Sequence, residues 1–372
     1  MTVNQKTIEW RIIGESVPGA SHLRVGTPNQ DAILQLRESS RSLPLIVSIA
    51  DGHGSPKCFR SDRGSRFAVK LSAHIVGEFL DARRSKFDLP EIESSGKESL
   101  PQKIVDEWRQ MVDADLEKQP FAPEEFENLA KKSDSKARQL VEENPRLAYG
   151  STLLAAALTE DFVLYLQLGD GEILNIAESG EVTKPLQADE RLLANETTSL
   201  CLPTAENDFR FLVQKINPEQ NPAMILLSTD GYLNSFSSET GFFQAGTDLL
   251  AMLRAENGFE TVSENLKGWL EEATQMGSGD DCTVAIIYRP DALKKPETAE
   301  TSETVIDKSV ATDLPTEGKT VEIPAALSPE NVENQEDVTV TITIKKDKNK
   351  NSKPPIVTVE KAPEDQKIID ED

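Results

Sequence analysis

The chain has 372 residues, 37% of them hydrophobic, and a formal net charge of −24 at neutral pH. That length suits two or three domains, or one large domain with an additional segment. A strongly acidic chain repels phosphate backbones, so the charge argues against a nucleic-acid partner. A phosphorylated protein stays open as a partner, provided that local cations or a metal ion offset the field.

The cysteines and the hydropathy of the chain indicate the cellular compartment in which the protein is expected. Cys58, Cys201 and Cys282 have neither the CxxC spacing nor the Cys/His spacing of a zinc site. Reduced thiols in a cytoplasmic protein are the simplest interpretation. The first ten residues are polar and unlike a secretion signal, and no apolar run reaches the length of a membrane span. We therefore expect a soluble, cytoplasmic protein.

The first half of the chain is predicted to combine strands with helices. Strands are predicted over Glu9–Glu15, Ala32–Arg37 and Leu45–Ala50, followed by an amphipathic helix over Asp62–Leu80. The charged stretch Asp81–Leu100 is predicted to be a loop. A helical segment over 102–144 follows, with helices over Gln102–Lys118 and Pro123–Asn144. Pro123 followed by two glutamates is typical of a helix start.

Strands predominate again after Gly150. They are predicted over Thr152–Thr159, Phe162–Gln167, Glu172–Ala177, Arg210–Lys215, Ala223–Ser228 and Cys282–Arg289, with helices over Leu249–Arg254 and Thr261–Gln275. Groups of strands interrupted by paired helices predict an α+β fold of antiparallel sheets with helices packed outside.

Composition changes after the last aromatic residue, Tyr288. Residues 291–372 contain no Phe, Trp or Tyr and are rich in Thr, Pro, Glu and Lys. Such a segment buries too little apolar area to offset chain entropy, so we predict a folded domain over 1–290 and a disordered acidic tail over 291–372. Within the tail, Val338–Ile344 alternates as a strand does; it either pairs with a sheet or partner, or is a patch protected by nearby lysines.

Aspartates recur at the ends of the predicted strands. They occupy the motifs NQDA, ADGHG, LGDG, STDG and GSGDD, at Asp31, Asp51, Asp170, Asp230, Asp280 and Asp281. One Asp-Gly alone is most simply a turn. Five such motifs instead predict carboxylates that meet at one sheet edge and repel each other unless a cation binds among them. Oxygen ligands select Mg²⁺ or Mn²⁺, and two such ions about 3.5–4 Å apart favour phosphoester hydrolysis.

NQDA, ADGHGS, YGST, LGDG, LLSTDGY and GDDCTV together resemble the motifs of metal-dependent protein phosphatases of the type-2C family. The resemblance covers roughly Trp10–Arg289, and the motifs are specific as a set although DGHG or TDG alone is not. It implies a β-sandwich of two antiparallel sheets flanked by helix pairs. It also implies metal-dependent hydrolysis of phosphoserine and phosphothreonine in proteins.

The resemblance implies a metal-binding role for the matching residues. Asp51 would bridge two ions, and the Gly52 carbonyl would bind one of them. Asp230 and Asp280 would bind the second ion, while Asp31 would hold metal-bound water close by. The two ions would be Mg²⁺ or Mn²⁺.

Other positions match the family less uniformly. Asp170 would help to bind a third, weaker ion. His53 matches the histidine that protonates the leaving alkoxide, and its alternative is a polar residue of a turn. Asp281 stands where many relatives have Asn, and Gln30 stands where eukaryotic relatives have Glu, so their roles stay open.

The residues that would bind substrate phosphate depart from the family. The usual Arg five residues before the Asp of NQDA is replaced by Gly26. GASHLRVGTPNQDA resembles instead a bacterial subgroup with a GxSHxxxGxPxQDA start, and offers His22 and Arg24. Arg60 and Arg63, near a predicted helix start, are two further candidates. A structural role is the alternative for all four.

Two function classes follow from these observations. The first is a phosphatase that acts on phosphorylated proteins, with a cognate Ser/Thr kinase as a partner and a monomeric state. The second is a pseudophosphatase or adaptor that binds phosphoproteins without turnover, as the missing Arg and the long tail favour. A phosphatase for small molecules is a third possibility. Neither a nucleic acid nor a membrane is expected as a partner.

Overall fold

The computed structural model describes residues 9–37, 43–83, 88–188, 198–217 and 221–293. All of them belong to one structural unit, Met1–Thr301. The predicted tail and its strand Val338–Ile344 lie outside the described residues, except that 291–293 belong to the 3₁₀ helix η4 (Pro290–Leu293). Among the described helices, none combines the length and the hydrophobicity that a membrane crossing requires.

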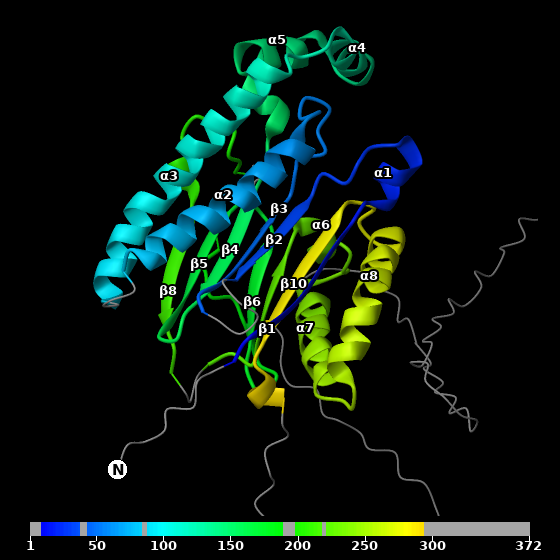
Figure 1. The fold of residues 1–372 in the computed structure, drawn as a ribbon. Helices are drawn as coiled ribbons and strands as arrows, with labels where there is room; N and C mark the ends of the chain where they lie inside the picture. The colour runs from blue at the N-terminus through cyan, green and yellow to red at the C-terminus, as the bar shows by residue number, and fades with distance from the viewer. Residues whose placement is uncertain (1–8, 38–42, 84–87, 189–197, 218–220, 294–372) are drawn as a thin grey trace, which may run out of the picture. The chain divides into compact units, whose positions relative to one another are not determined.

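Two five-stranded antiparallel sheets form the centre of the domain (Figure 1). In the first sheet the order is β1 (Arg11–Val17), β10 (Cys282–Tyr288), β9 (Met224–Ser228), β6 (Glu172–Ile176) and β7 (Val182–Thr183). In the second it is β2 (Ala32–Arg37), β3 (Leu45–Ala50), β4 (Leu153–Leu158), β5 (Phe162–Leu168) and β8 (Arg210–Lys215). The predicted α+β sandwich is therefore confirmed.

A pair of helices covers the outer face of each sheet (Figure 1). The helices α2 (Ser61–Asp81) and α3 (Leu89–Lys118) pack on the β2-containing sheet, and α7 (Glu239–Leu253) and α8 (Gly258–Met276) pack on the β1-containing sheet. Three apolar clusters result, one between the sheets and one under each helix pair. Central strands such as β3, β4 and β9 are buried along their whole length, which explains their continuous apolar runs.

Shorter elements lie at the ends of these layers. They are α1 (Ala20–Val25), α4 (Pro123–Lys132), α5 (Ser135–Glu143), α6 (Asp230–Leu233) and the 3₁₀ helices η1 (Pro145–Tyr149) and η3 (Ala205–Asp208). The sequence did not indicate α6 or β7. The predicted helix over Pro123–Asn144 is divided, because Asp134 accepts a hydrogen bond from the Ala137 N–H at 3.1 Å and starts a new helix.

The predicted loop over Asp81–Leu100 is wrong from Leu89 onward. The Asp88 side chain accepts a hydrogen bond from the Glu91 N–H at 3.3 Å and caps α3, which continues through Gly96 to Lys118. The glycine that suggested a loop serves packing instead, since a Cβ at Gly96 would lie 2.7 Å from the Phe211 ring. A tertiary contact therefore outweighs the weak helix propensity of this stretch.

Trp108 of α3 gives a test of how far this helix stabilises the domain. Its side chain is fully buried, and its Nε1–H donates to the Gly64 carbonyl of α2 at 3.0 Å. We expect Trp108→Ala to lower the free energy of unfolding by about 3–5 kcal/mol in urea denaturation. Leu140→Ala, at a residue that is 44% exposed, is the control and should change it by less than about 0.5 kcal/mol. A loss below about 1 kcal/mol for Trp108→Ala would contradict this packing.

Candidate functional site

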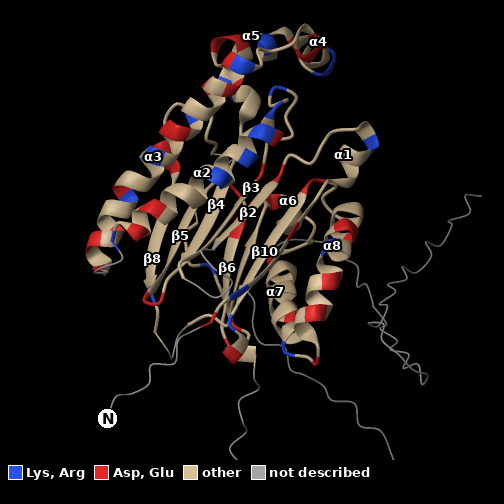
Figure 2. Cartoon of the chain, viewed as in Figure 1, with Lys and Arg blue, Asp and Glu red and all other residues tan. Residues whose placement is uncertain are grey.

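The antiparallel register brings the strand-end aspartates to one end of the sandwich. Ala32 at the start of β2 pairs with Ala50 at the end of β3, so Asp31 and Asp51 lie beside each other. Ser228 at the end of β9 pairs with Val284 near the start of β10, which places Asp230 and Asp280 at the same end of the other sheet. Figure 2 shows acidic residues where β2, β3 and β10 meet α1 and α6.

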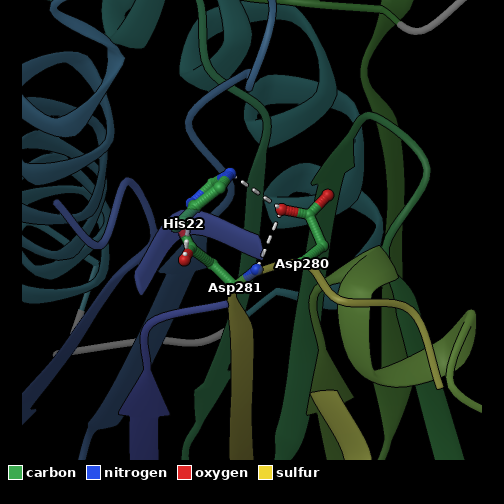
Figure 3. Close-up of side chains that lie close together, drawn as sticks. All are labelled: His22, Asp280 and Asp281. Atoms are coloured by element: carbon green, nitrogen blue, oxygen red, sulfur yellow. Dashed lines mark hydrogen bonds and ion pairs between the residues drawn. The ribbon is translucent and has the colours of Figure 1, made fainter. Parts of the chain in front are cut away.

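Two groups of potential metal ligands form at this end of the sandwich. One carboxylate oxygen from each of Asp51, Asp170 and Asp230 lies within 4.8 Å of the others. A second group, with the same spacing, consists of His22, Asp280 and Asp281 (Figure 3). The structure therefore brings together the aspartates of four separate sequence motifs, and adds a histidine from α1.

Asp31 is a buried candidate metal ligand, at 7% exposed. Its Oδ2 accepts hydrogen bonds from Thr229 Oγ1 at 2.8 Å and Thr283 Oγ1 at 2.7 Å, whereas its buried Oδ1 accepts none. Burial, followed by repulsion from Asp281, raises the pKa of Asp31 to about 8. A buried carboxylate oxygen without a donor is the kind of atom that a cation satisfies, so the donor set fits divalent metal ions.

The neighbouring carboxylates are perturbed in the same direction. Burial, and then the charges of Asp31 and Asp230, raise the pKa of Asp51 well above its usual value. Burial and the charge of Asp170 raise the pKa of Asp230 to about 7. Without a cation these groups are costly to ionise together, which is the expected electrostatic signature of a metal-binding cluster.

Close backbone contacts explain the glycine after Asp51. A Cβ at Gly52 would lie 2.4 Å from the Gln30 carbonyl oxygen and 2.7 Å from that of Ser61, so no other residue fits. Gly52 forms a β-bridge with Ser151, and the Asp51 N–H donates to Thr152 Oγ1 at 3.0 Å. These contacts fix the backbone on both sides of Asp51.

His53 follows directly in the same turn. Its N–H donates to the Gly150 carbonyl at 3.1 Å, and its carbonyl accepts from Ser61 Oγ at 3.0 Å. A Cβ at Gly150 would lie 2.8 Å from His53 Cδ2, so the imidazole packs against this glycine. Burial lowers the pKa of His53, and the charge of Asp170 opposes that shift. The imidazole is therefore held in a fixed place near the carboxylates.

Arg60 is committed to structural contacts. Its five N–H groups donate to the Glu125 carboxylate through Nε and Nη2, to the carbonyls of Gln119 and Pro120, and to the Tyr149 hydroxyl. The guanidinium also lies 4.7 Å from the centre of the Phe121 ring. The suggestion that Arg60 binds substrate phosphate is therefore corrected, because its donors already join α2 to the segment before α4.

The other three candidate phosphate ligands lie in different settings. Arg63 Nη1 donates to Asp115 Oδ2 at 2.9 Å and keeps a partly exposed side chain. Arg24 is exposed in the last turn of α1. His22 lies between the carboxylates of Asp280 and Asp281 rather than facing solvent alone (Figure 3).

Three threonines that shape the site were not singled out from the sequence, and Gln30 was named there without a role. Thr229 and Thr283 bind Asp31, and Thr152 binds the backbone of Asp51. Gln30 is buried, and its side chain donates to Ser61 Oγ and, at 3.5 Å, to the His53 carbonyl. Threonines directly before or soon after the motif aspartates, as in STDG and GDDCT, are the signal that was available.

The chain belongs to the protein phosphatase 2C family, whose sequence model matches residues 18–271. It is thus a protein serine/threonine phosphatase that acts on phosphorylated proteins, and the pseudophosphatase alternative is not favoured. No curated protein sequence matches this chain.

Solved structures with similar folds come from bacteria and from an animal. A sex-determining protein of C. elegans is 17% identical over 78% of this chain and 68% of its own, with a TM-score of 0.47. PppA, a regulatory component of the type VI secretion system of Pseudomonas aeruginosa, is 16% identical over 75% and 97%, with a TM-score of 0.46. The Mycobacterium tuberculosis serine/threonine phosphatase PstP/Ppp is 18% identical over 76% and 99%, with a TM-score of 0.41.

The raised carboxylate pKa values predict a pH-dependent effect of metal on stability. As pH rises from about 4 to 8, the unfolded chain releases protons that folded Asp31 and Asp230 still hold, so the metal-free fold loses stability. A divalent cation replaces those protons. We therefore expect Mn²⁺, relative to EDTA, to raise the unfolding temperature more at pH 8 than at pH 5.

Two variants make this thermal measurement specific. Asp51→Asn should reduce the Mn²⁺-induced shift at pH 8, because it removes one charge from the cluster. Asp248→Asn, at an exposed residue of α7, is the matched control and should keep the wild-type shift. Equal shifts at the two pH values in the wild-type chain would contradict the cation-binding interpretation.

Proposed function

We propose that this phosphatase uses two Mg²⁺ or Mn²⁺ ions, with a third bound more weakly, to hydrolyse phosphoserine and phosphothreonine in proteins. The observation that carries the proposal is the buried Asp31 Oδ1, which lacks a hydrogen-bond donor in a cluster of mutually repelling carboxylates. Bound ions would polarise the phosphoryl group and activate a water molecule for attack. All other steps fall to side chains and backbone groups of this chain.

The aspartates take the roles that the family pattern suggests. Asp51, which lies with Asp170 and Asp230 in one group of potential ligands, would hold both principal ions, and the Gly52 carbonyl would be a further ligand. Asp230 and Asp280 bind the second ion, and Asp31 holds water close by. Asp170 completes the group with Asp51 and Asp230 and contributes to the third ion. Hydrogen bonds from the two threonines orient the Asp31 carboxylate and partly offset the burial that raises its pKa.

His53 is the proposed general acid. Hydrolysis of a phosphoserine expels an alkoxide, a strong base that leaves readily only if it receives a proton. The backbone contacts of His53 to Gly150 and Ser61 hold the imidazole beside the carboxylates, so a proton on the ring is delivered from a fixed direction.

Substrate phosphate is proposed to meet Arg24 and Arg63 from the solvent side. Arg24 is exposed on α1, in the same short helix as His22, and Arg63 has one ion pair with the rest of its side chain partly exposed. Such cations offset the repulsion between a phosphoprotein and an acidic enzyme. Arg60 is not part of this proposal.

The compartment, the oligomeric state and the partner of the enzyme are also part of the proposal. We expect a cytoplasmic monomer that opposes a Ser/Thr kinase, with the catalytic domain in residues 1–290. The net charge of −24 supports a soluble protein and disfavours nucleic-acid substrates.

Phosphate release from a phosphothreonine peptide tests the proposed function directly. We expect turnover with Mn²⁺ or Mg²⁺, none with EDTA, and a loss of at least about a hundredfold in Asp51→Asn, because the ions supply several kcal/mol of transition-state stabilisation. Asp248→Asn is again the matched control. Turnover that persists in EDTA would refute a metal-dependent mechanism, and a preference for sugar phosphates over phosphopeptides would refute the protein substrate.

Leaving-group chemistry tests the role of His53. We expect His53→Gln to slow hydrolysis of a phosphoserine peptide by about 10²–10⁴-fold, the usual range for general acid catalysis. Hydrolysis of p-nitrophenyl phosphate should change far less, because its phenolate leaves without a proton. Equal losses on both substrates would show that His53 is structural, and His74→Gln, on the exposed face of α2, serves as the control.

A further inference from the structure

His22 of α1 is held between two carboxylates on the loop before β10 (Figure 3). Its Nδ1 lies 2.9 Å from Asp281 Oδ1, and its Nε2 lies 3.6 Å from Asp280 Oδ1. The helix is anchored to the same loop, since the Ser21 N–H donates to the Gly279 carbonyl at 2.9 Å. The imidazole therefore has a defined orientation, with one nitrogen toward each aspartate.

Asp281 fixes that orientation. Only 3% of this residue is exposed, and Oδ1 also accepts the Gly19 N–H at 2.6 Å while Oδ2 accepts the Gln30 N–H at 2.7 Å. A carboxylate that accepts from these backbone groups is held as an acceptor, so the Nδ1 of His22 is the nitrogen that carries a proton toward it. The lone pair of a neutral His22 is then on Nε2.

In neutral His22 the Nε2 atom and Asp280 Oδ1 are two acceptors that face each other, and a cation between them would take the place of the proton that the hydrogen bond to Asp281, followed by the neighbouring carboxylate charges, favours by raising the pKa of His22. Nitrogen and oxygen ligands at about 2.0–2.2 Å from one metal ion are separated by roughly 3.0–4.2 Å, depending on the angle between them. The observed 3.6 Å falls within that range. An imidazole that donates its other N–H to a carboxylate is also the usual arrangement of a metal-binding histidine.

A second observation points to a cation in the same region. Asp31 follows Gln30, whose backbone Asp281 holds, and the 7%-exposed Asp31 has an Oδ1 with no hydrogen-bond donor. The charge of Asp31 also helps to raise the pKa of His22, so the two side chains interact electrostatically. Asp281 therefore positions the imidazole of His22 through one oxygen. Through the other oxygen it positions the backbone next to Asp31, whose Oδ1 has no hydrogen-bond donor.

We propose that His22 Nε2 is a nitrogen ligand of the ion that Asp280 binds, and that Asp281 is the residue that positions it. The inference rests on the proposed metal site and adds to it a preference among metals. A nitrogen ligand strengthens binding of divalent transition metals relative to Mg²⁺, which favours oxygen ligands alone. The chain would then select Mn²⁺ or a later transition metal, and His22 would not be a phosphate ligand.

Pulsed electron paramagnetic resonance of the full chain with bound Mn²⁺ tests this inference. We expect the echo modulation of a directly bound ¹⁴N in the wild-type protein and its loss in His22→Gln. His74→Gln is the matched control, because His74 is 65% exposed in its side chain and pairs with Glu78 on α2. Growing the wild-type protein with ¹⁵N-histidine should change the modulation without any substitution, which keeps the test valid if His22→Gln folds poorly.

Competition between Mn²⁺ and Mg²⁺ gives an independent readout of binding. The ratio of Mn²⁺ to Mg²⁺ affinity should fall about tenfold in His22→Gln, and Mn²⁺ affinity should fall by about tenfold in Asp281→Asn. The Asn variant keeps one acceptor oxygen but cannot accept both His22 and Gln30. An unchanged affinity ratio in His22→Gln would overturn the inference.

The outcomes separate this inference from the function on which it rests. Mn²⁺ that binds in an Asp51-dependent manner without ¹⁴N modulation overturns the nitrogen ligand alone, and leaves His22 as a protonated ion-pair partner of Asp280 and Asp281. Modulation that survives His22→Gln but disappears in His53→Gln also overturns it, since His53 would be the ligand. A wild-type chain that binds no Mn²⁺ overturns both the inference and the proposed function.

Discussion

Mutual repulsion among carboxylates at one end of the sandwich governs the arrangement of the rest of the site. Asp31, Asp51 and Asp230 all have raised pKa values because burial removes water from charges that already oppose each other. A fold holds such groups together only if rigid elements supply the geometry and a cation supplies the opposite charge. The two stacked sheets provide that rigidity, since every candidate aspartate ligand lies within two residues of a strand or at the start of α6.

The surrounding residues hold the cluster by hydrogen bonds rather than by neutralising it. Thr229 and Thr283 share one oxygen of Asp31, and Asp281 accepts backbone N–H groups from the segment before β2. None of these contacts cancels a full charge, so the cluster keeps its capacity to bind cations. The basic residues after ADGHG act elsewhere: Arg60 joins α2 to the helical segment through donors that are all in use.

A helix or strand was predicted correctly from the sequence where the residues that determine it are close together in the chain. The strand Leu45–Ala50 is observed as predicted because a short apolar run is bounded by Pro44 and Asp51. The start of α3 was missed because its serines and Gly96 read as a loop, whereas burial of Ile92 and contact with Phe211 decide in favour of helix. For α7, Ser238 caps a helix that begins before the predicted Leu249. The decisive partner of α3, Phe211, is distant in sequence, and local propensity carries no information about it, whereas the cap of α7 is a local signal.

The sequence by itself determined the family motifs, the order of strands and helix pairs, and the aspartates that cluster at one end, because each depends on a short pattern of residues. Only the tertiary structure decided what the charged residues near those motifs contact. Arg60 turns away to Glu125, His22 lies between Asp280 and Asp281, and the two acceptor oxygens of Asp281 are filled by the segment before β2. These outcomes depend on which side chains the packed sheets bring face to face, and that pairing is a property of the whole fold rather than of any segment.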